Sequence, residues 1–256
     1  MSIRIFQNPV AENLKQIMQT KNSNLGLALD LPDKKKFLTV LEKLGDYICL
    51  VKTHIDIIEN FDWQFIKELL KLKEKYNFLI FEDRKFVDIG KIVKCQYSRG
   101  LYKIIEWADI INCHIISGPG VIEGLREAVS EQRRNRALLI VMQMTSDGQL
   151  INQAYTEQAL AWAKEYSDFV IGFIASAQDK QAFSILRRKA GLEFMLFTPG
   201  IHFNESRDSL RQTYLPPATA VSLGADVILV GQGIYEAEDN LMVKTAKKYQ
   251  QAGWLE

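Results

Sequence analysis

Charged side chains end three apolar runs in the first third of this 256-residue sequence: Asp30, Lys52, His54, Asp83, Lys85 and, just beyond the third run, Asp88. If the ends of these runs meet in the folded chain, lysines and aspartates share a small, partly desolvated volume. An unpaired charge is costly there, so the groups must pair with one another or with a ligand. The alternation of Lys and Asp indicates a preorganised electrostatic site. A structural ion-pair network, or simple exposure to water, stays open for each residue alone.

Short apolar runs that could position these charges recur along the chain, at 24–30, 47–54, 78–85, 109–116, 137–145, 169–175, 194–201 and 226–234. Their near-continuous apolar character is typical of parallel strands buried on both faces, because half-exposed strands alternate. Helix-period segments lie between them. Trp63–Tyr76 is one, with an apolar stripe through Phe65, Leu69 and Leu72, and 155–166 is another.

The strand-then-helix order repeats about every 25 to 30 residues, which predicts a (β/α)₈ TIM barrel. A doubly wound open sheet is the alternative, since periodicity does not show that the last strand meets the first. No linker divides the chain, so we expect residues 1–256 to form one domain. Residues 1–23 are an N-terminal extension, expected to form a short helix that plugs or flanks the barrel. Ligands of such barrels bind at the carboxyl ends of the strands, where the charges lie.

Composition excludes several partner classes. With 32 basic and 31 acidic residues the net charge is +1, so no long-range field favours nucleic acid or an anionic membrane. The first 18 residues lack the zones of a signal peptide and no apolar run approaches roughly 18 residues, so we expect a protein that is neither exported nor inserted in a membrane. Cys49, Cys95 and Cys113 have no metal-type spacing and suit reduced thiols in the cytoplasm. The three histidines also lack the spacing of metal ligands, so we expect no bound metal. For His114 and His202 we expect structural roles.

The segment 81–90, FEDRKFVDIG, resembles the signature of the orotidine 5′-monophosphate decarboxylase family, in its eukaryotic-type branch. The similarity runs through most of the chain, in LALD, VKTHIDI, NCHIISGPGV, TPGI and VGQGI. It implies a TIM barrel that decarboxylates a nucleotide without a cofactor and works as a homodimer in pyrimidine biosynthesis.

The resemblance also implies roles for individual residues. Lys52, Asp83, Lys85 and Asp88 match the family's charged tetrad, with Asp88 reaching into the partner subunit's site. The substrate-binding positions that match are Asp30, His54, Ile89, Ile92, Thr145, Pro199, Gln212, Tyr214, Gly231 and Gln232. Among them, Asp30 together with Lys52 would bind ribose hydroxyls, and Thr145 and Gln212 would read the pyrimidine.

Four positions depart from the family pattern. Gln232 stands where the family has an arginine that grips the phosphate, and a neutral amide offers no charge-assisted pair. Ile92 replaces a threonine, Ala28 a serine and Gln143 a glutamate. Arg207 and Arg211 precede Tyr214 in the same loop region and could compensate for the missing arginine.

Three hypotheses follow. The first is decarboxylation of orotidine monophosphate to uridine monophosphate, with Lys85 as proton donor to the carbanion left at C6. The second is a diverged barrel enzyme acting on a related nucleoside or nucleotide with altered phosphate recognition. The third is a non-catalytic nucleotide-binding homologue, which the retained charges disfavour because clustered charges are costly to keep without use.

Overall fold

Parallel strands close into a barrel in the order β1 to β8, with β1 paired to both β2 and β8. The structure is a computed structural model that describes residues 4, 6–144, 146, 148–176, 180–203 and 214–254. The strands are β1 (Leu25–Ala28), β2 (Leu50–Thr53), β3 (Leu79–Phe86), β4 (Ile110–Cys113), β5 (Ala137–Val141), β6 (Val170–Ile174), β7 (Met195–Thr198) and β8 (Val227–Val230). Each lies inside a predicted run, apart from the last residue of β3. Closure confirms the TIM barrel and excludes the open sheet.

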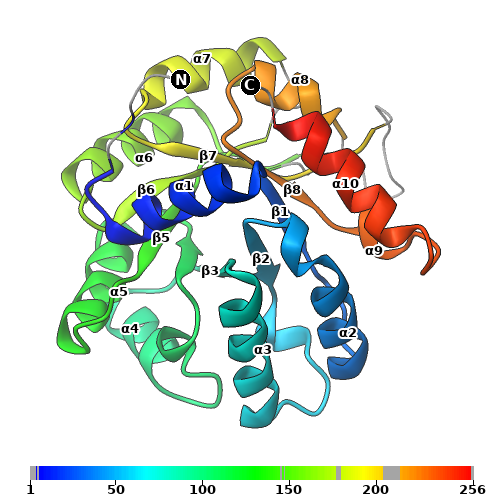
Figure 1. Ribbon diagram of the computed structural model, residues 1–256. Helices are drawn as coiled ribbons and strands as arrows, with labels where there is room; N and C mark the ends of the chain where they lie inside the picture. The colour runs from blue at the N-terminus through cyan, green and yellow to red at the C-terminus, as the bar shows by residue number, and fades with distance from the viewer. Residues whose placement is uncertain are drawn as a thin grey trace.

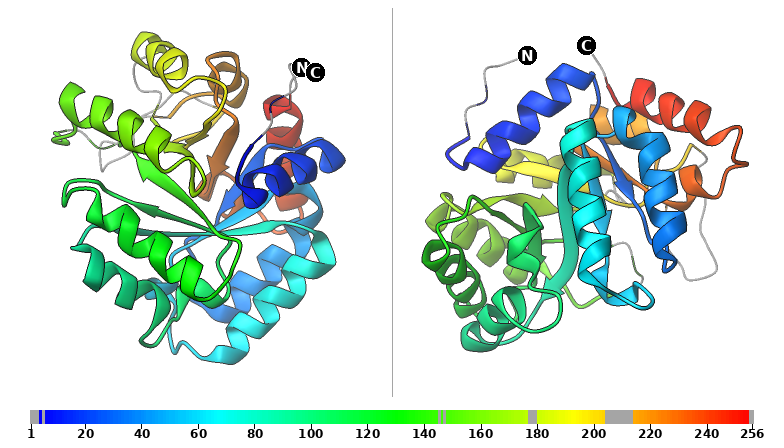
Figure 2. Two further views of the ribbon diagram at one scale, coloured as in Figure 1. Left: turned by 90° about the vertical axis from the view of Figure 1, so that its left-hand side faces the viewer. Right: turned by 60° about the horizontal axis from the view of Figure 1, so that its bottom comes forward.

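Helices surround the strands (Figures 1 and 2). They are α1 (Pro9–Lys21), α2 (Lys34–Leu44), α3 (Trp63–Tyr76), α4 (Gly90–Ser98), α5 (Gly120–Glu131), α6 (Gln153–Glu165), α7 (Lys180–Ala190), α8 (Pro217–Ser222), α9 (Gln232–Tyr235) and α10 (Met242–Gly253), with 3₁₀ turns η1 (Gly45–Tyr47), η2 (Ile55–Ile57) and η3 (Ile104–Glu106). None of the helices in the described part of the chain is long and apolar enough to cross a membrane.

Local capping explains the bounds of α3, which match the prediction. The Asp62 side chain accepts a hydrogen bond from the Phe65 N–H at the helix start. Asn77 adopts the left-handed conformation at the helix end, where its N–H donates to the Lys73 carbonyl. Phe65 and Leu69 are buried against the barrel, as the apolar stripe predicts.

Two apolar layers result from the strand period of two. Alternate strand residues such as Leu50, Leu79 and Phe81 fill the barrel interior. Their neighbours pack outward against the helices. A Cβ at Gly26 would lie 2.6 Å from Leu229 Cδ2, so a larger residue at this position of β1 would require the interior leucines to shift.

Helix α1 closes one end of the barrel. Its buried residues Val10, Leu14 and Ile17 belong to the same apolar cluster as the interior strand residues. In Figure 1 it crosses the middle of the ring of outer helices. With one end closed by α1, the opposite end, where the strands finish, is left for a ligand. The division into one domain with an N-terminal extension stays a prediction.

Strand β3 departs from regular pairing at its end. Glu82 pairs with Ile111 and Phe86 with Cys113, so three residues of β3 oppose the single residue Asn112 of β4. Within this bulge Lys85 has φ of +50°, a backbone conformation unfavourable for a residue with a side chain.

Candidate active site

A cavity of about 730 Å³ opens at the carboxyl ends of the strands. Nine of the predicted site residues line it: Asp30, Lys52, His54, Asp83, Lys85, Pro199, Tyr214, Gly231 and Gln232. The charged ones come from β1, β2 and β3 and the residues just after them, and Gly231 and Gln232 follow β8. The structure thus brings together the run-end charges that the sequence pointed to.

The register of the barrel explains this convergence. Lys52 lies two residues after Leu50, and Asp83 two residues after Phe81, and both apolar residues face the interior. Because side chains alternate along a strand, the two charges continue the inward-facing rows. Lys52 is paired in register with Phe81. The interior therefore changes from apolar to charged within one side-chain layer.

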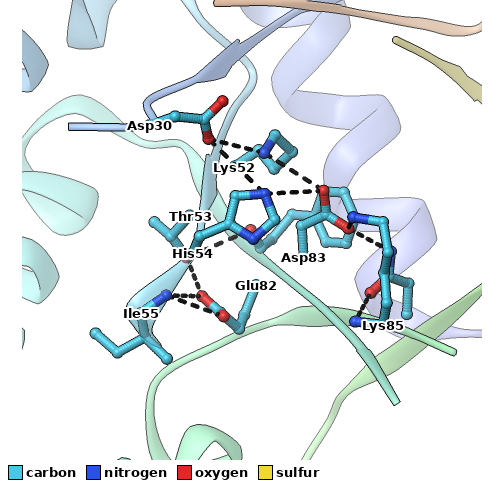
Figure 3. A network of polar contacts seen from close by, with 10 residues as sticks. Asp30, Lys52, Thr53, His54, Ile55, Glu82, Asp83 and Lys85 are labelled. Carbon is cyan, nitrogen blue, oxygen red and sulfur yellow. Dashed lines mark hydrogen bonds and ion pairs between the residues drawn. The ribbon is translucent and has the colours of Figure 1, made fainter. Parts of the chain in front are cut away.

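The Asp83 carboxylate is the centre of the charged cluster (Figure 3). Its Oδ1 accepts a hydrogen bond from Lys85 Nζ at 2.6 Å. Its Oδ2 lies 3.4 Å from Lys52 Nζ and 3.3 Å from His54 Nε2. Lys52 also donates to Asp30 Oδ1 at 3.0 Å. The cluster therefore runs Asp30, Lys52, Asp83, Lys85 with alternating charge.

At Lys52 and Asp83, the two most buried members of the cluster, ion pairing outweighs the effect of desolvation on the pKa. Burial alone would lower the pKa of Lys52, but Asp83 and Asp30 outweigh it and the pKa is raised. Burial would likewise raise the pKa of Asp83, yet the His54 hydrogen bond and the charges of Lys52 and Lys85 hold it well below its usual range. Both groups are charged near neutral pH, and Lys85, whose side chain is 31% exposed, presents its ammonium to the cavity.

Glu82 forms a second carboxyl site behind the first. Phe81 and Asp83, its neighbours on β3, face the interior, so Glu82 faces outward. It is completely buried there. Thr53 Oγ1 donates to its Oε2 at 2.5 Å, and the Ile55 N–H lies 3.1 Å from its Oε1. These bonds join β3 to the last residue of β2 and to the segment that follows it, which begins with His54. Burial raises the pKa of Glu82 to about 8.

Three predicted site residues lie outside the cavity. Asp88, Ile89 and Ile92 are exposed, and Asp88 forms no ion pair with any residue that the structure describes. Asp88 Oδ1 accepts from the Ile89 N–H, and its carbonyl accepts from Ser117 Oγ. Within one chain, none of the three forms a hydrogen bond or ion pair with the described residues of the charged cluster. Thr145 and Gln212, with Arg207 and Arg211, lie outside the described residues.

Other residues complete the cavity without having been predicted, notably Met144, Ile174, Tyr235 and Glu236. His202, expected to be structural, also lines it, together with the departures Ala28 and Gln143. Asn112 was missed as well: it is buried, and its amide contacts both Asp83 and the Lys85 backbone. A polar residue inside the apolar run 109–116 was the available signal. Among the described residues, no three His, Cys, Asp or Glu side chains could hold a metal ion.

Fold and site together define a (β/α)₈ barrel enzyme with a lysine–aspartate cluster at the carboxyl ends of its strands. Residues 23–249 match the profile of the orotidine 5′-phosphate decarboxylase / HUMPS family. The chain belongs to this family.

Curated relatives resemble the chain along almost its whole length. The orotidine 5′-phosphate decarboxylase of Schizosaccharomyces pombe is 42% identical, over 99% of this chain and 96% of that protein. That of Kodamaea ohmeri is 43% identical, over 96% of this chain and 93% of the relative.

Solved structures share the fold. An orotidine 5′-monophosphate decarboxylase from Methanocaldococcus jannaschii, complexed with the inhibitor BMP, superposes with a TM-score of 0.71 at 20% identity, covering 89% of this chain and 97% of the other. The enzyme from Pyrococcus horikoshii gives a TM-score of 0.71 at 22% identity, covering 90% and 98%. At such identities the likeness concerns the barrel alone.

Glu82 predicts a pH dependence of stability. Its pKa is about 8 in the folded protein, against about 4.5 for a glutamate in water, so the folded protein keeps a proton that the unfolded chain releases between these pH values. Its stabilising contribution is therefore complete below about pH 4.5 and is lost as the pH rises through about 8. Glu82→Gln keeps an acceptor for Ile55 and removes the titration. We expect the wild-type Tm to fall from pH 5 to pH 8.5 by on the order of 5 °C more than that of the variant.

Thermal unfolding at both pH values checks this, with the exposed Glu74→Gln as control, which should follow the wild type. Equal slopes for wild type and Glu82→Gln would show that Glu82 ionises normally in the folded protein.

Proposed function

We propose that the protein decarboxylates orotidine 5′-monophosphate to uridine 5′-monophosphate without a cofactor. The observation that carries the proposal is the cluster in which Asp83 pairs with both Lys52 and Lys85 at the cavity. The full-length similarity to fungal proteins named orotidine 5′-phosphate decarboxylase supports this substrate over those of other members of the family.

The reaction breaks the bond between C6 and the substrate carboxylate, CO₂ leaves, and the electron pair stays on C6 in the ring plane. A fixed ammonium beside C6 stabilises this charge and then donates a proton to it. Lys85 is suited to that role, because Asp83 holds its ammonium at the cavity. The ionised Asp83 also crowds the substrate carboxylate, and this repulsion disappears as CO₂ leaves.

Removing the ammonium tests this mechanism. Lys85→Ala should lower kcat for orotidine monophosphate by at least roughly 1,000-fold, because both charge stabilisation and the proton donor are lost. The measurement is the decrease of orotate absorbance on mixing enzyme with substrate. Lys75→Ala, at an exposed position on α3, is the matched control and should keep wild-type activity. Wild-type protein that neither turns over orotidine monophosphate nor binds 6-substituted uridylates would refute the proposed function.

The proposed site binds the phosphate group of the substrate less strongly than the family pattern would. Gln232 is exposed at the start of α9 and lines the cavity beside Gly231 and Tyr214. Its amide supplies only neutral hydrogen bonds to a phosphate, where an arginine would supply charge-assisted ones. The substrate phosphate is therefore held more weakly here than an arginine would hold it.

Restoring the charge tests this. Gln232→Arg should lower KM for orotidine monophosphate roughly tenfold to hundredfold, the range of a hydrogen bond to a charged group. Gln251→Arg, which adds the same charge at an exposed position of α10, should leave KM unchanged. A Gln232→Arg variant with no gain in kcat/KM would favour a different, related nucleoside or nucleotide as the substrate.

A homodimer with shared sites is also part of the proposal. Asp88 lies outside its own cavity, among exposed apolar residues on the loops after β3 and β4. Ile89 is 60% exposed and Ile116 is 74% exposed. These loops are held together by the hydrogen bond from Ser117 Oγ to the Asp88 carbonyl. An apolar patch of this kind is typical of a protein interface, across which Asp88, Ile89 and Ile92 would reach the partner's cavity.

Hybrid dimers test the shared site. Asp88→Asn and Lys85→Ala proteins should each be inactive, and mixing them should restore part of the activity, because one of the two sites in a hybrid contains both native residues. Turnover is measured after subunit exchange, which is followed by mass spectrometry of differently tagged chains. Exchange without recovered activity would contradict sites shared between subunits.

We place the reaction in the cytoplasm. The three cysteines are free thiols, and Cys49 and Cys113 are buried in the barrel, where they pack as small apolar residues. A fold without disulfides suits a reducing compartment.

A further inference from the structure

The end of β3 contains an irregularity that ordinary strand pairing does not stabilise. Between the register pairs Glu82–Ile111 and Phe86–Cys113, three residues of β3 face one residue of β4. The ladder resumes only at Phe86, whose carbonyl accepts from the His114 N–H at 2.8 Å. Asp83 and Lys85 both lie in this unpaired stretch. Their backbone therefore needs another source of hydrogen bonds.

The side chain of Asn112, the single residue opposite the bulge, supplies one such bond to the Lys85 backbone and a second hydrogen bond to the Asp83 side chain. Its Oδ1 accepts a hydrogen bond from the Lys85 backbone N–H at 2.7 Å. Its Nδ2 donates to Asp83 Oδ1 at 2.6 Å. The same Asp83 oxygen accepts from Lys85 Nζ, also at 2.6 Å. One buried amide thus holds the main chain of the lysine and the carboxylate that binds its ammonium.

The conformation of Lys85 makes this support necessary. Its φ of +50° is unfavourable for a residue with a side chain and persists only where the surroundings enforce it. The hydrogen bond from its N–H to Asn112 is a contact that enforces it. Without this bond the backbone would relax, and the ammonium would leave the position that Asp83 defines.

Only an amide fits both partners. The position requires an acceptor for a backbone N–H and, on the same side chain, a donor to an ionised carboxylate. An aspartate would replace the donor by a second negative charge, and an apolar residue would leave the part-buried Lys85 N–H without this acceptor. Asn112 is 0% exposed and is not among the residues that line the cavity, so its effect on a ligand is indirect.

We propose that Asn112 is a positioning residue that holds Asp83 and Lys85 in their reactive arrangement across the bulge. The catalytic part of this inference rests on the proposed decarboxylation. It assigns to Asn112 an effect on the chemical step and not on substrate binding.

The kinetic test compares Asn112→Ala and Asn112→Asp with the wild type. Asn112→Ala should lower kcat by roughly 100-fold, the cost of a small misplacement of reacting groups, while KM changes little. Ile111→Val, a change at the buried neighbouring residue of β4, is the control and should keep kcat. A wild-type kcat in folded Asn112→Ala would overturn the proposal.

The pH profile separates positioning from simple structural support. In Asn112→Asp the introduced carboxyl keeps an acceptor for the Lys85 N–H, but it donates to Asp83 only when protonated. The ratio of its kcat to that of the wild type should therefore rise as the pH falls. A ratio that does not change with pH would refute the donor role of Asn112. If Asn112→Ala does not fold, the kinetic test is made with Asn112→Asp alone.

A third measurement needs no substrate. Acetylation by acetic anhydride, followed by peptide mass spectrometry, should modify Lys85 several-fold faster in Asn112→Ala, or in Asn112→Asp at high pH, than in the wild type. Lys73, paired with Asp109 at the other end of the barrel, is the internal control. An unchanged rate at Lys85 would overturn the positioning role. If the wild type is inactive but Lys85 is acetylated faster in the Asn112 variants, the proposed function is refuted and the positioning role stands.

Discussion

The ion pairs of Asp83 are the constraint on which the rest of the site depends. Its side chain is only 12% exposed, and that of Lys52 is 8% exposed. Charges buried to this extent are costly unless each has a partner of opposite sign and further hydrogen bonds. Asp83 meets this condition through Lys52, His54, Lys85 and Asn112. Removing any one partner leaves part of a buried charge uncompensated, so the members depend on one another.

The closed barrel makes this arrangement possible. Strand alternation carries Lys52 and Asp83 into the interior on neighbouring strands, where the ladder fixes their separation. The outward-facing Glu82 then binds Thr53 at the end of β2 and Ile55 in the segment that follows it. The charged layer is thus held from inside by ion pairs and from outside by a buried carboxyl. A site on flexible loops would lose this preorganisation, on which electrostatic catalysis depends.

Much of this was predictable from the sequence, because burial leaves a simple pattern. Apolar runs located the strands, and polar residues at their ends located Asp30, Lys52, Asp83 and Lys85. The bulge was not predictable, since the register of β3 against β4 is a property of two distant segments. Asn112 was therefore missed although its run was identified: a polar residue in an apolar run is visible in the sequence, but the two residues of β3 to which its amide bonds are not.

Three predicted residues lie outside the cavity for a different reason from the one that hid Asn112. Asp88, Ile89 and Ile92 came from resemblance to a family, and a family's site can include residues of a second chain. Their exposure in one chain is what a shared site requires, because a residue buried in its own subunit could not reach the partner's cavity. The pattern of one sequence carries no information about which chain a residue serves.

The contrast between the two ends of the cavity has a physical basis. A change at Lys52 or Asp83 leaves a buried charge unpaired and so affects folding as well as chemistry. Gln232 is exposed at the start of a four-residue helix, where an amide and a guanidinium are both solvated. Replacing one by the other therefore costs the fold little and alters only what the cavity binds. Under the proposed function, the end of the cavity at Gln232 is thus free to vary in affinity while the charged cluster is kept, and changes at the two ends should separate experimentally into effects on KM and effects on kcat.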